Sequence, residues 1–318
     1  SANKLLFGSE RSTHTVLFKN AIELTDASNT GAQSRVITVA LGTGTAPEVD
    51  IQGAISNGAG SNATLNKSGE GTLVLSGVQS YGYGLQINRG VVRMNNAAGF
   101  ALNPSTGTVK RDIIMGGEST IEGSAVFNTL TATPSQYGVT GLDIHFLPAG
   151  TKFGFSAYAA DFTINLGGNA TTPNTYTWNQ TNGSFLSASQ TLMFGSRHAT
   201  HTVLWRNPIK LTSTTAGDRT IEVLDGTAAV DADMQGELSE TSGVVANLVK
   251  TGLGTLQLSA ANSYTGPTNV NEGRLLLAGS VAGNVNVADG AALAGIGSVG
   301  GSATRSEEHT SELQSPNT

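Results

Sequence analysis

The chain has 318 residues, of which 41 are Gly, 8 are Pro and none is Cys. Hydrophobic residues make up 38% and charged residues 13%, which is enough apolar content to form a core and excludes a wholly disordered chain. The formal net charge of -6 argues against a nucleic-acid-binding protein, because such proteins normally present a basic face. The lack of Cys excludes disulfides, thiol catalysis and cysteine metal sites.

A long segment near the start of the chain recurs in its second half. A first unit at about 5–95 corresponds to a second unit at about 192–280, and divergent residues lie between them. The clearest matches are 6–9 with 193–196, 14–18 with 201–205 and 65–76 with 248–259. Self-similarity at a fixed spacing is typical of solenoids and other repeat arrays.

Each unit consists of short apolar or alternating segments separated by Gly, Asn and Ser, such as 72–76, 85–87 and 91–94. No window of about twelve residues combines a helical period with capping residues, so we expect almost no helix. A β-sandwich or a closed barrel does not explain serial duplication with small deletions, whereas stacked coils absorb a deletion as a change in one loop. The sequence therefore predicts a single all-β solenoid over 1–304.

The pattern also predicts which residues lie inside. Alternate positions of a strand share one face, so Leu73, Leu75, Leu256 and Leu258 are expected to point into the core. The Gly pairs at 69 and 71 and at 252 and 254 are expected to form the turn before each strand, with at least one Gly of each pair at positive φ.

Residues 250–277 begin Lys-Thr-Gly-Leu-Gly-Thr-Leu-Gln-Leu-Ser and closely resemble the autotransporter-associated β-strand repeat, also called the passenger-associated transport repeat. They depart from its usual pattern at Ala260, where Gly is common. The earlier copy at 67–92 resembles it more loosely, with Gln79 in place of Asn and Leu85 in place of Thr.

This resemblance implies a right-handed parallel β-helix in a large bacterial protein that is secreted or displayed at the cell surface, in association with the outer membrane. The segment 283–301 resembles the coil that often follows the repeat. Such proteins often end in an outer-membrane β-barrel or another anchor, which we expect outside this stretch. The implied role is that of a stalk or adhesin, with glycans or surface proteins as candidate partners. Successive stacking of coils outside the cell is thought to assist secretion in this family.

The alternative is a β-helix module that binds or degrades polysaccharide, and its candidate groups are acids. Asp225, Asp231 and Asp233 form the densest acidic group, with Arg219 upstream. Asp233 corresponds to Asp50 of the first unit, whereas our alignment gives Asp225 and Asp231 no acidic counterpart. We interpret the group as a solvated loop and expect no enzymatic activity, no metal and no cofactor.

Other candidate groups also favour structural roles. Gly295-Ile-Gly-Ser-Val-Gly300 fits a dinucleotide-binding pattern, but neither a helix nor a suitably placed acid is expected after it, so we interpret it as the corners of a coil. His14 and His201 are equivalent in the two units and therefore many coils apart, which favours corner positions over a shared metal site. The same interpretation applies to His145. We expect four aromatic side chains to pack against neighbouring coils rather than to bind sugars. They are Tyr81, Tyr83, Tyr176 and Trp178.

The end of the chain differs in amino-acid composition from the rest. Residues 305–316 read Arg-Ser-Glu-Glu-His-Thr-Ser-Glu-Leu-Gln-Ser-Pro and match one translation of a common sequencing adapter. We therefore expect 305–318 to be a non-native tail, and the natural protein to continue beyond Thr304. The tail residues Arg305, Glu307, Glu308 and Glu312 are expected to be exposed, with Leu313 burying little surface.

Overall fold

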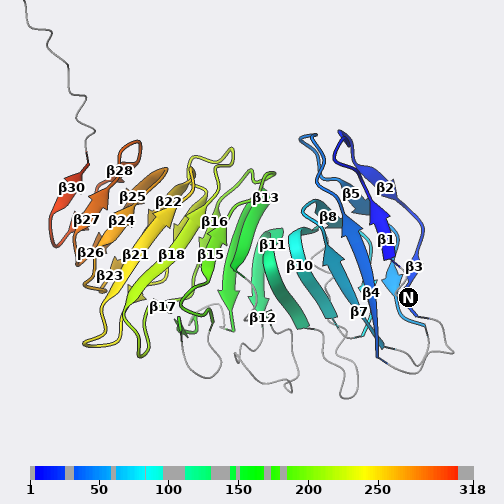
Figure 1. Cartoon of the computed structure of the whole chain (residues 1–318), viewed down its shortest axis with the longest axis horizontal. Coiled ribbons are helices and arrows are strands. Elements are labelled where there is room, and N and C mark those ends of the chain that lie inside the picture. The colour runs from blue at the N-terminus through cyan, green and yellow to red at the C-terminus, as the bar shows by residue number, and fades with distance from the viewer. Residues whose placement is uncertain are drawn as a thin grey trace, which may run out of the picture.

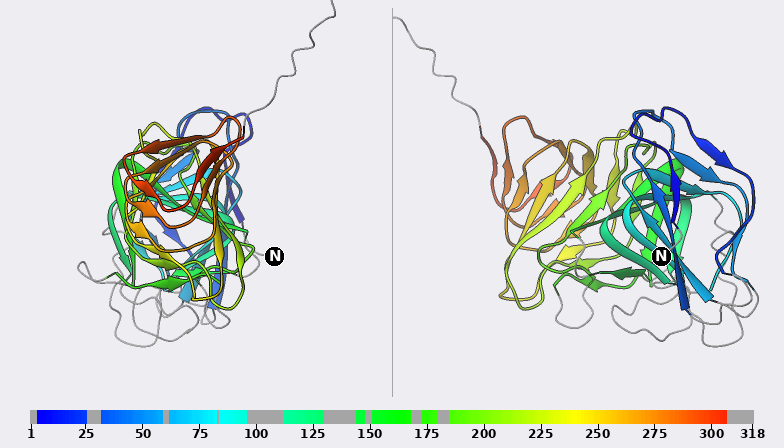
Figure 2. Two further views of the ribbon diagram at one scale, coloured as in Figure 1. Left: turned by 90° about the vertical axis from the view of Figure 1, so that its left-hand side faces the viewer. Right: turned by 45° about the vertical axis from the view of Figure 1, so that its right-hand side comes forward.

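The computed structural model describes residues 4–25, 32–58, 62–82, 84–95, 112–129, 144–147, 151–167, 173–179 and 185–306. In these residues the chain forms parallel strands and no helix, so none of the described segments is a helix able to cross a membrane. The strands stack along the long axis of the molecule (Figure 1), and a view along that axis shows them wound around a common interior (Figure 2). The fold is the all-β parallel β-helix that the sequence predicts.

Three columns of hydrogen-bonded strands run along the stack. The first column contains β1 (Lys4–Phe7), β4 (Ala32–Val39), β7 (Asn62–Ser68) and β12 (Ile144–Phe146). Strands of both units lie in the second column, which we call the shared column. It contains β2 (Val16–Phe18), β5 (Val49–Ile51), β8 (Thr72–Leu75), β15 (Thr191–Phe194), β18 (Gly217–Val223), β21 (Ala246–Thr251), β24 (Thr268–Val270), β27 (Val285–Val287) and β30 (Ala303–Arg305). The last column contains β16 (Val203–Trp205), β19 (Ala232–Met234), β22 (Thr255–Leu258), β25 (Arg274–Leu277) and β28 (Ala292–Gly295).

Long strands connect these columns, and very short strands complete the coils. The long strands are β10 (Gly84–Met94), β11 (Asp112–Thr129) and β13 (Lys152–Leu166). The two-residue strands are β3 (Ile22–Glu23), β6 (Ile55–Ser56), β9 (Gln79–Ser80), β14 (Tyr176–Thr177), β17 (Ile209–Lys210), β20 (Leu238–Ser239), β23 (Ala261–Asn262), β26 (Ser280–Val281) and β29 (Ser298–Val299).

The two units are out of phase by one column. In the first unit, the strand at 62–68 lies in the first column, whereas its equivalent in the second unit, at 246–251, lies in the shared column. The change takes place in β11, whose successive parts pair with β12, with the start of β13 and with the end of β13. The duplicated sequence predicts the strands of each unit, and the divergent residues between the units set how the units are joined.

Apolar side chains fill the interior from coil to coil. In the shared column, Leu73 pairs with Val92, which is followed in register by Ile121, Phe155 and Phe194, and all five side chains are fully buried. Continuous apolar burial of this kind is expected for parallel strands.

The predictions for the core leucines and for the turn glycines are confirmed. Leu73, Leu75, Leu256 and Leu258 are each at most 1% exposed. Gly69 and Gly252 have φ values of 76° and 74°. A Cβ atom on either would lie 2.3 Å from a backbone carbonyl oxygen of the preceding coil, so both positions require Gly for conformation and for space.

The start of the expected tail continues the stack. Arg305 ends β30 with an exposed side chain, and the N–H of Ser306 donates to the carbonyl oxygen of Val287 at 2.9 Å. Glu307, Glu308, Glu312 and Leu313 lie outside the described residues. The identity of 305–318 as a non-native tail stays a prediction.

Candidate functional site

Each unit contains the same tight turn, which we call the repeat turn, at 67–72 in the first unit and 250–255 in the second. It joins a strand that starts a coil to the strand that follows, β7 to β8 and β21 to β22. The polar groups buried around the repeat turn are the first candidates for a functional site, because buried charges need partners.

A buried lysine lies under each repeat turn. Lys67 and Lys250 have no exposed surface. The Nζ of Lys250 donates to the carbonyl oxygen of Gly252 at 2.5 Å and to that of Glu272, one coil further on, at 3.0 Å. The Nζ of Lys67 donates to the carbonyl oxygen of Arg89 at 2.7 Å. Each lysine therefore fastens the repeat turn to the next coil.

Burial controls the protonation of these lysines. Removal from water lowers the pKa of Lys67 to about 7, although the negative charges of Glu48 and Glu70 act in the opposite direction. The same cause lowers the pKa of Lys250 to about 8, against the charges of Glu272 and Asp231.

A buried carboxylate completes the repeat turn in the second unit. Asp231 is 2% exposed and accepts the N–H of Gly226 and the N–H of Thr255, both at 2.8 Å. Burial raises the pKa of Asp231, while these two hydrogen bonds lower it. One carboxylate oxygen thus holds the loop at Gly226, and the other holds the end of the repeat turn at Thr255.

The first unit has the same carboxylate, which corrects our alignment. Glu48 is 2% exposed, and its two oxygens accept the N–H of Gly42 at 3.1 Å and the N–H of Thr72 at 2.6 Å. Since Thr72 and Thr255 begin equivalent strands, Glu48 is the counterpart of Asp231. The shared offset of 183 residues was visible in the sequence, but the change from Glu to Asp hid the match.

The interpretation of the acidic group as a solvated loop is wrong for most of its members. Asp225 is exposed, but Asp233 is 7% exposed and accepts hydrogen bonds from Ser259 Oγ at 2.6 Å and from Gln235 Nε2 at 2.9 Å. Arg219 is 2% exposed and donates to backbone carbonyl oxygens, and its burial lowers its pKa. These groups stabilise turns and coil contacts because their charged atoms already have backbone or side-chain partners.

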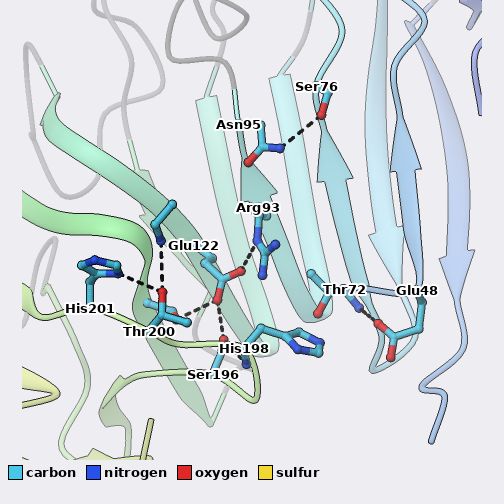
Figure 3. A network of polar contacts seen from close by, with 12 residues as sticks. Glu48, Thr72, Ser76, Arg93, Asn95, Glu122, Ser196, His198, Thr200 and His201 are labelled. Atoms are coloured by element: carbon cyan, nitrogen blue, oxygen red, sulfur yellow. Dashed lines mark hydrogen bonds and ion pairs between the residues drawn. The ribbon is translucent and has the colours of Figure 1, made fainter. Parts of the chain in front are cut away.

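A second polar cluster lies between the units and was not predicted (Figure 3). Glu122 is fully buried and accepts from Arg93 Nε at 2.5 Å, from Ser196 Oγ at 2.5 Å and from Ser156 Oγ at 2.9 Å. The guanidinium of Arg93 lies 3.4 Å from the ring centre of Tyr158. The cluster joins β10, β11, β13 and the loop after β15, so it connects segments that have no periodic relationship in the sequence.

In the described residues of this cluster, the serine and the histidine do not form a nucleophile–base pair. The hydroxyl of Ser196 donates to Glu122, and the backbone N–H of His198 donates to that hydroxyl at 3.1 Å. In a Ser–His pair, the serine hydroxyl instead donates a hydrogen bond to an imidazole nitrogen. Among the described residues, no group of three or more His, Asp or Glu side chains is arranged to hold a metal ion.

A family model named passenger-associated-transport-repeat matches residues 65–94 and 248–277. The chain carries two passenger-associated transport repeats. Comparison with curated proteins gives no match, and neither does comparison with solved structures. Repeats of this type are structural repeats of autotransporter passengers, not an enzyme family, and they imply a secreted or surface-exposed protein.

The transport repeats contain the repeat turns and the buried lysines. The two copies differ at one buried position. In the second transport repeat, the buried hydroxyl of Tyr264 lies 2.6 Å from Thr268 Oγ1. In the first, Leu85 takes the place of that Thr and is 1% exposed. Asn262 bridges three successive coils by accepting from Leu238 N–H and donating to the carbonyl oxygen of Ser280.

The histidines equivalent in the two units occupy equivalent loops. His14 Nδ1 lies 2.8 Å from Thr13 Oγ1, and His201 Nδ1 lies 2.9 Å from Thr200 Oγ1. His145 belongs to β12, and its side chain is partly buried.

The remaining candidates are structural elements of the coils. Trp178 is fully buried, its Nε1 donates to the carbonyl oxygen of Ser187 at 2.9 Å, and Tyr176 is 6% exposed, so neither presents a sugar-binding face. Tyr81 is 4% exposed, and Tyr83 lies outside the described residues. The motif at 295–300 contains the end of β28, the turn after it and β29, and β30 rather than a helix follows it.

Proposed function

We propose that the chain is a structural segment of a secreted or surface-displayed bacterial autotransporter-like protein, in which it serves as a stalk that presents adhesive surfaces. We further propose that stacking of its coils assists its own secretion, with an anchor located elsewhere in the protein. The observation that carries this proposal is the presence of two transport repeats in one parallel stack of strands.

The buried polar groups support a structural role. The carboxylates of Glu48, Asp231 and Asp233 accept hydrogen bonds that hold turns or neighbouring coils. These carboxylates are therefore engaged by donors of the chain itself rather than directed at a substrate. We therefore expect purified chain not to depolymerise pectin, alginate or other acidic glycans faster than buffer does.

Secretion can be tested with the chain displayed as the passenger of an outer-membrane β-barrel. Gly252→Val blocks a repeat turn, because a Cβ there meets the carbonyl oxygen of Val223 at 2.3 Å. Gly243→Val is the matched control, since Gly243 also has positive φ but has no atom within 4 Å of its Cβ position. We expect labelling of intact cells to decrease for Gly252→Val relative to the control, at equal total expression. Equal surface labelling of the two variants would contradict the role in secretion.

A further inference from the structure

The loop at 195–202, between β15 and β16, reaches across to the first unit. Arg197 Nη1 donates to the carbonyl oxygen of Gly42 at 2.7 Å, and Nη2 donates to that of Gly44. These residues are 155 and 153 positions apart in the sequence. One guanidinium thus joins the loop at 195–202 to the loop at 40–48, between β4 and β5.

The polar cluster around Glu122 lies directly behind this contact. Ser196, the residue before Arg197, donates to Glu122, which is fully buried and paired with Arg93. The loop at 195–202 is therefore held at two points, by Arg197 on the backbone of the first unit and by Ser196 on the junction between the units.

His198 is the buried titratable group of this loop. It is 7% exposed, and its Nε2 has no hydrogen-bond partner among the residues that the structure describes. The charged groups that act on its ring are Glu122 of β11, Arg93 of β10, Glu48 of the loop at 40–48, and Arg197 of its own loop. Figure 3 shows the ring directed toward the side of Thr72 and Glu48.

The equivalent loop of the first unit lacks these features. Ser9, Glu10 and Arg11 occupy the positions of Ser196, Arg197 and His198, and all three are exposed. Among the described residues, only the loop of the second unit makes this contact. The divergence is confined to a loop, while the flanking strands keep their repeated sequence.

We propose that the loop at 195–202 is an acid-sensitive latch that fastens the second unit to the first, with His198 as its titrating group. The neighbouring carboxylates are already engaged, Glu122 by Arg93 and two serines, and Glu48 by two backbone N–H groups. Protonation of His198 places a cation near two guanidinium groups and leaves a buried N–H without an acceptor. When the loop opens, water can hydrate both the charged ring and this N–H.

The direction of the pH effect follows from burial. Loss of hydration lowers the pKa of His198 below its ordinary value of 6.5, against the charges of Glu122 and Glu48 and together with those of Arg93 and Arg197. The open loop then binds protons more readily than the closed loop. The latch is at full strength above about pH 6.5 and weakens as the pH falls through the lowered pKa.

Hydrogen exchange of the full chain at about pH 7.5 and 5.5, corrected for intrinsic rates, tests this proposal. The reporting amides include those of His198, Gly42 and Thr200, which are hydrogen-bonded in the closed latch. We expect several-fold faster exchange at the lower pH in the two loops, with unchanged protection in β22 and β25. Unchanged exchange in the two loops would overturn the proposal.

Three variants separate the latch from general acid sensitivity. Arg197→Gln should speed hydrogen exchange in both loops at both pH values. Arg11→Gln, at the exposed position equivalent to His198, should leave the exchange of both loops unchanged. His198→Gln should remove the pH response. If His198→Gln alters folding, the NMR titration of His198 in the unaltered chain decides instead. A pKa at or above 6.5, or an equal pH response in a folded His198→Gln variant, would overturn the proposal.

Discussion

Glu48 and Asp231 occupy the same position in the two units, although their side chains differ by one methylene group. Each is 2% exposed and joins the N–H of a loop glycine to the N–H of the threonine that begins the next strand. A single carboxylate thereby satisfies one backbone donor of the repeat turn and one of a separate loop. The repeat turn thus depends on an acid that lies outside the segment matched by the transport-repeat model.

Asp231→Asn should destabilise the second unit. The amide retains one acceptor, but its NH2 group faces one of the two backbone donors, and a buried donor left without an acceptor costs about 1–3 kcal/mol. Urea denaturation measures the change in the free energy of unfolding. Asp225→Asn, at an exposed position of the same loop, should stay within about 0.5 kcal/mol of the unaltered chain. An equally small change for Asp231→Asn would show that the turn does not need the carboxylate.

Gly252→Ala should cost more than Gly243→Ala. Both residues have positive φ, 74° and 77°, so both substitutions carry the left-handed penalty of about 1–2 kcal/mol. Only at Gly252 does the new Cβ also meet backbone, the carbonyl oxygen of Val223 at 2.3 Å. The difference between the two variants in thermal denaturation therefore measures the close approach of successive coils. Equal losses would mean that the coils separate enough to accept a methyl group.

Leu256→Ala should destabilise the stack by about 2–4 kcal/mol, because it leaves a cavity in a close-packed interior. Leu256 is fully buried and pairs in register with Ala232 and Leu275 of the neighbouring coils. Leu253→Ala in the same turn is the control, since Leu253 is 73% exposed. A cost for Leu256→Ala no larger than that of the control would be incompatible with its place in the core.

The success of the sequence predictions depended on the range of the interactions. Alternation identified Leu256 as a core residue, and the glycine pairs identified the repeat turns, because both signals act within a few residues. The phase change in β11 left no such signal, since its pairing depends on divergent residues between the units.

The buried polar groups were the main failure, for two different reasons. The match of Asp231 with Glu48 was present in the sequence but required treating Asp and Glu as equivalent. The contact of Arg197 with Gly42 joins loops 155 residues apart and ends on a backbone carbonyl, so no residue type at the acceptor position reveals it.

The buried lysines should make stability increase with pH above neutrality. Burial lowers the pKa of Lys67 to about 7 and that of Lys250 to about 8, from 10.5. Between each lowered value and 10.5 the unfolded chain binds more protons than the folded chain, so the free energy of unfolding rises with pH. The rise is at most about 1.4 kcal/mol per pH unit for each lysine.

Urea denaturation between about pH 7 and 8.5 measures this slope, in a range where unfolded tyrosines, with a pKa of about 10, stay protonated. That limit matters because burial raises the pKa of Tyr264, which acts in the opposite direction at higher pH. Lys67→Met should flatten the slope, since the lysine stem is already surrounded by the core and only the ionisable group is removed. Lys19→Met, at an exposed position, should leave the slope unchanged. A slope that is the same in Lys67→Met and in the unaltered chain would show that Lys67 stays charged in the folded protein.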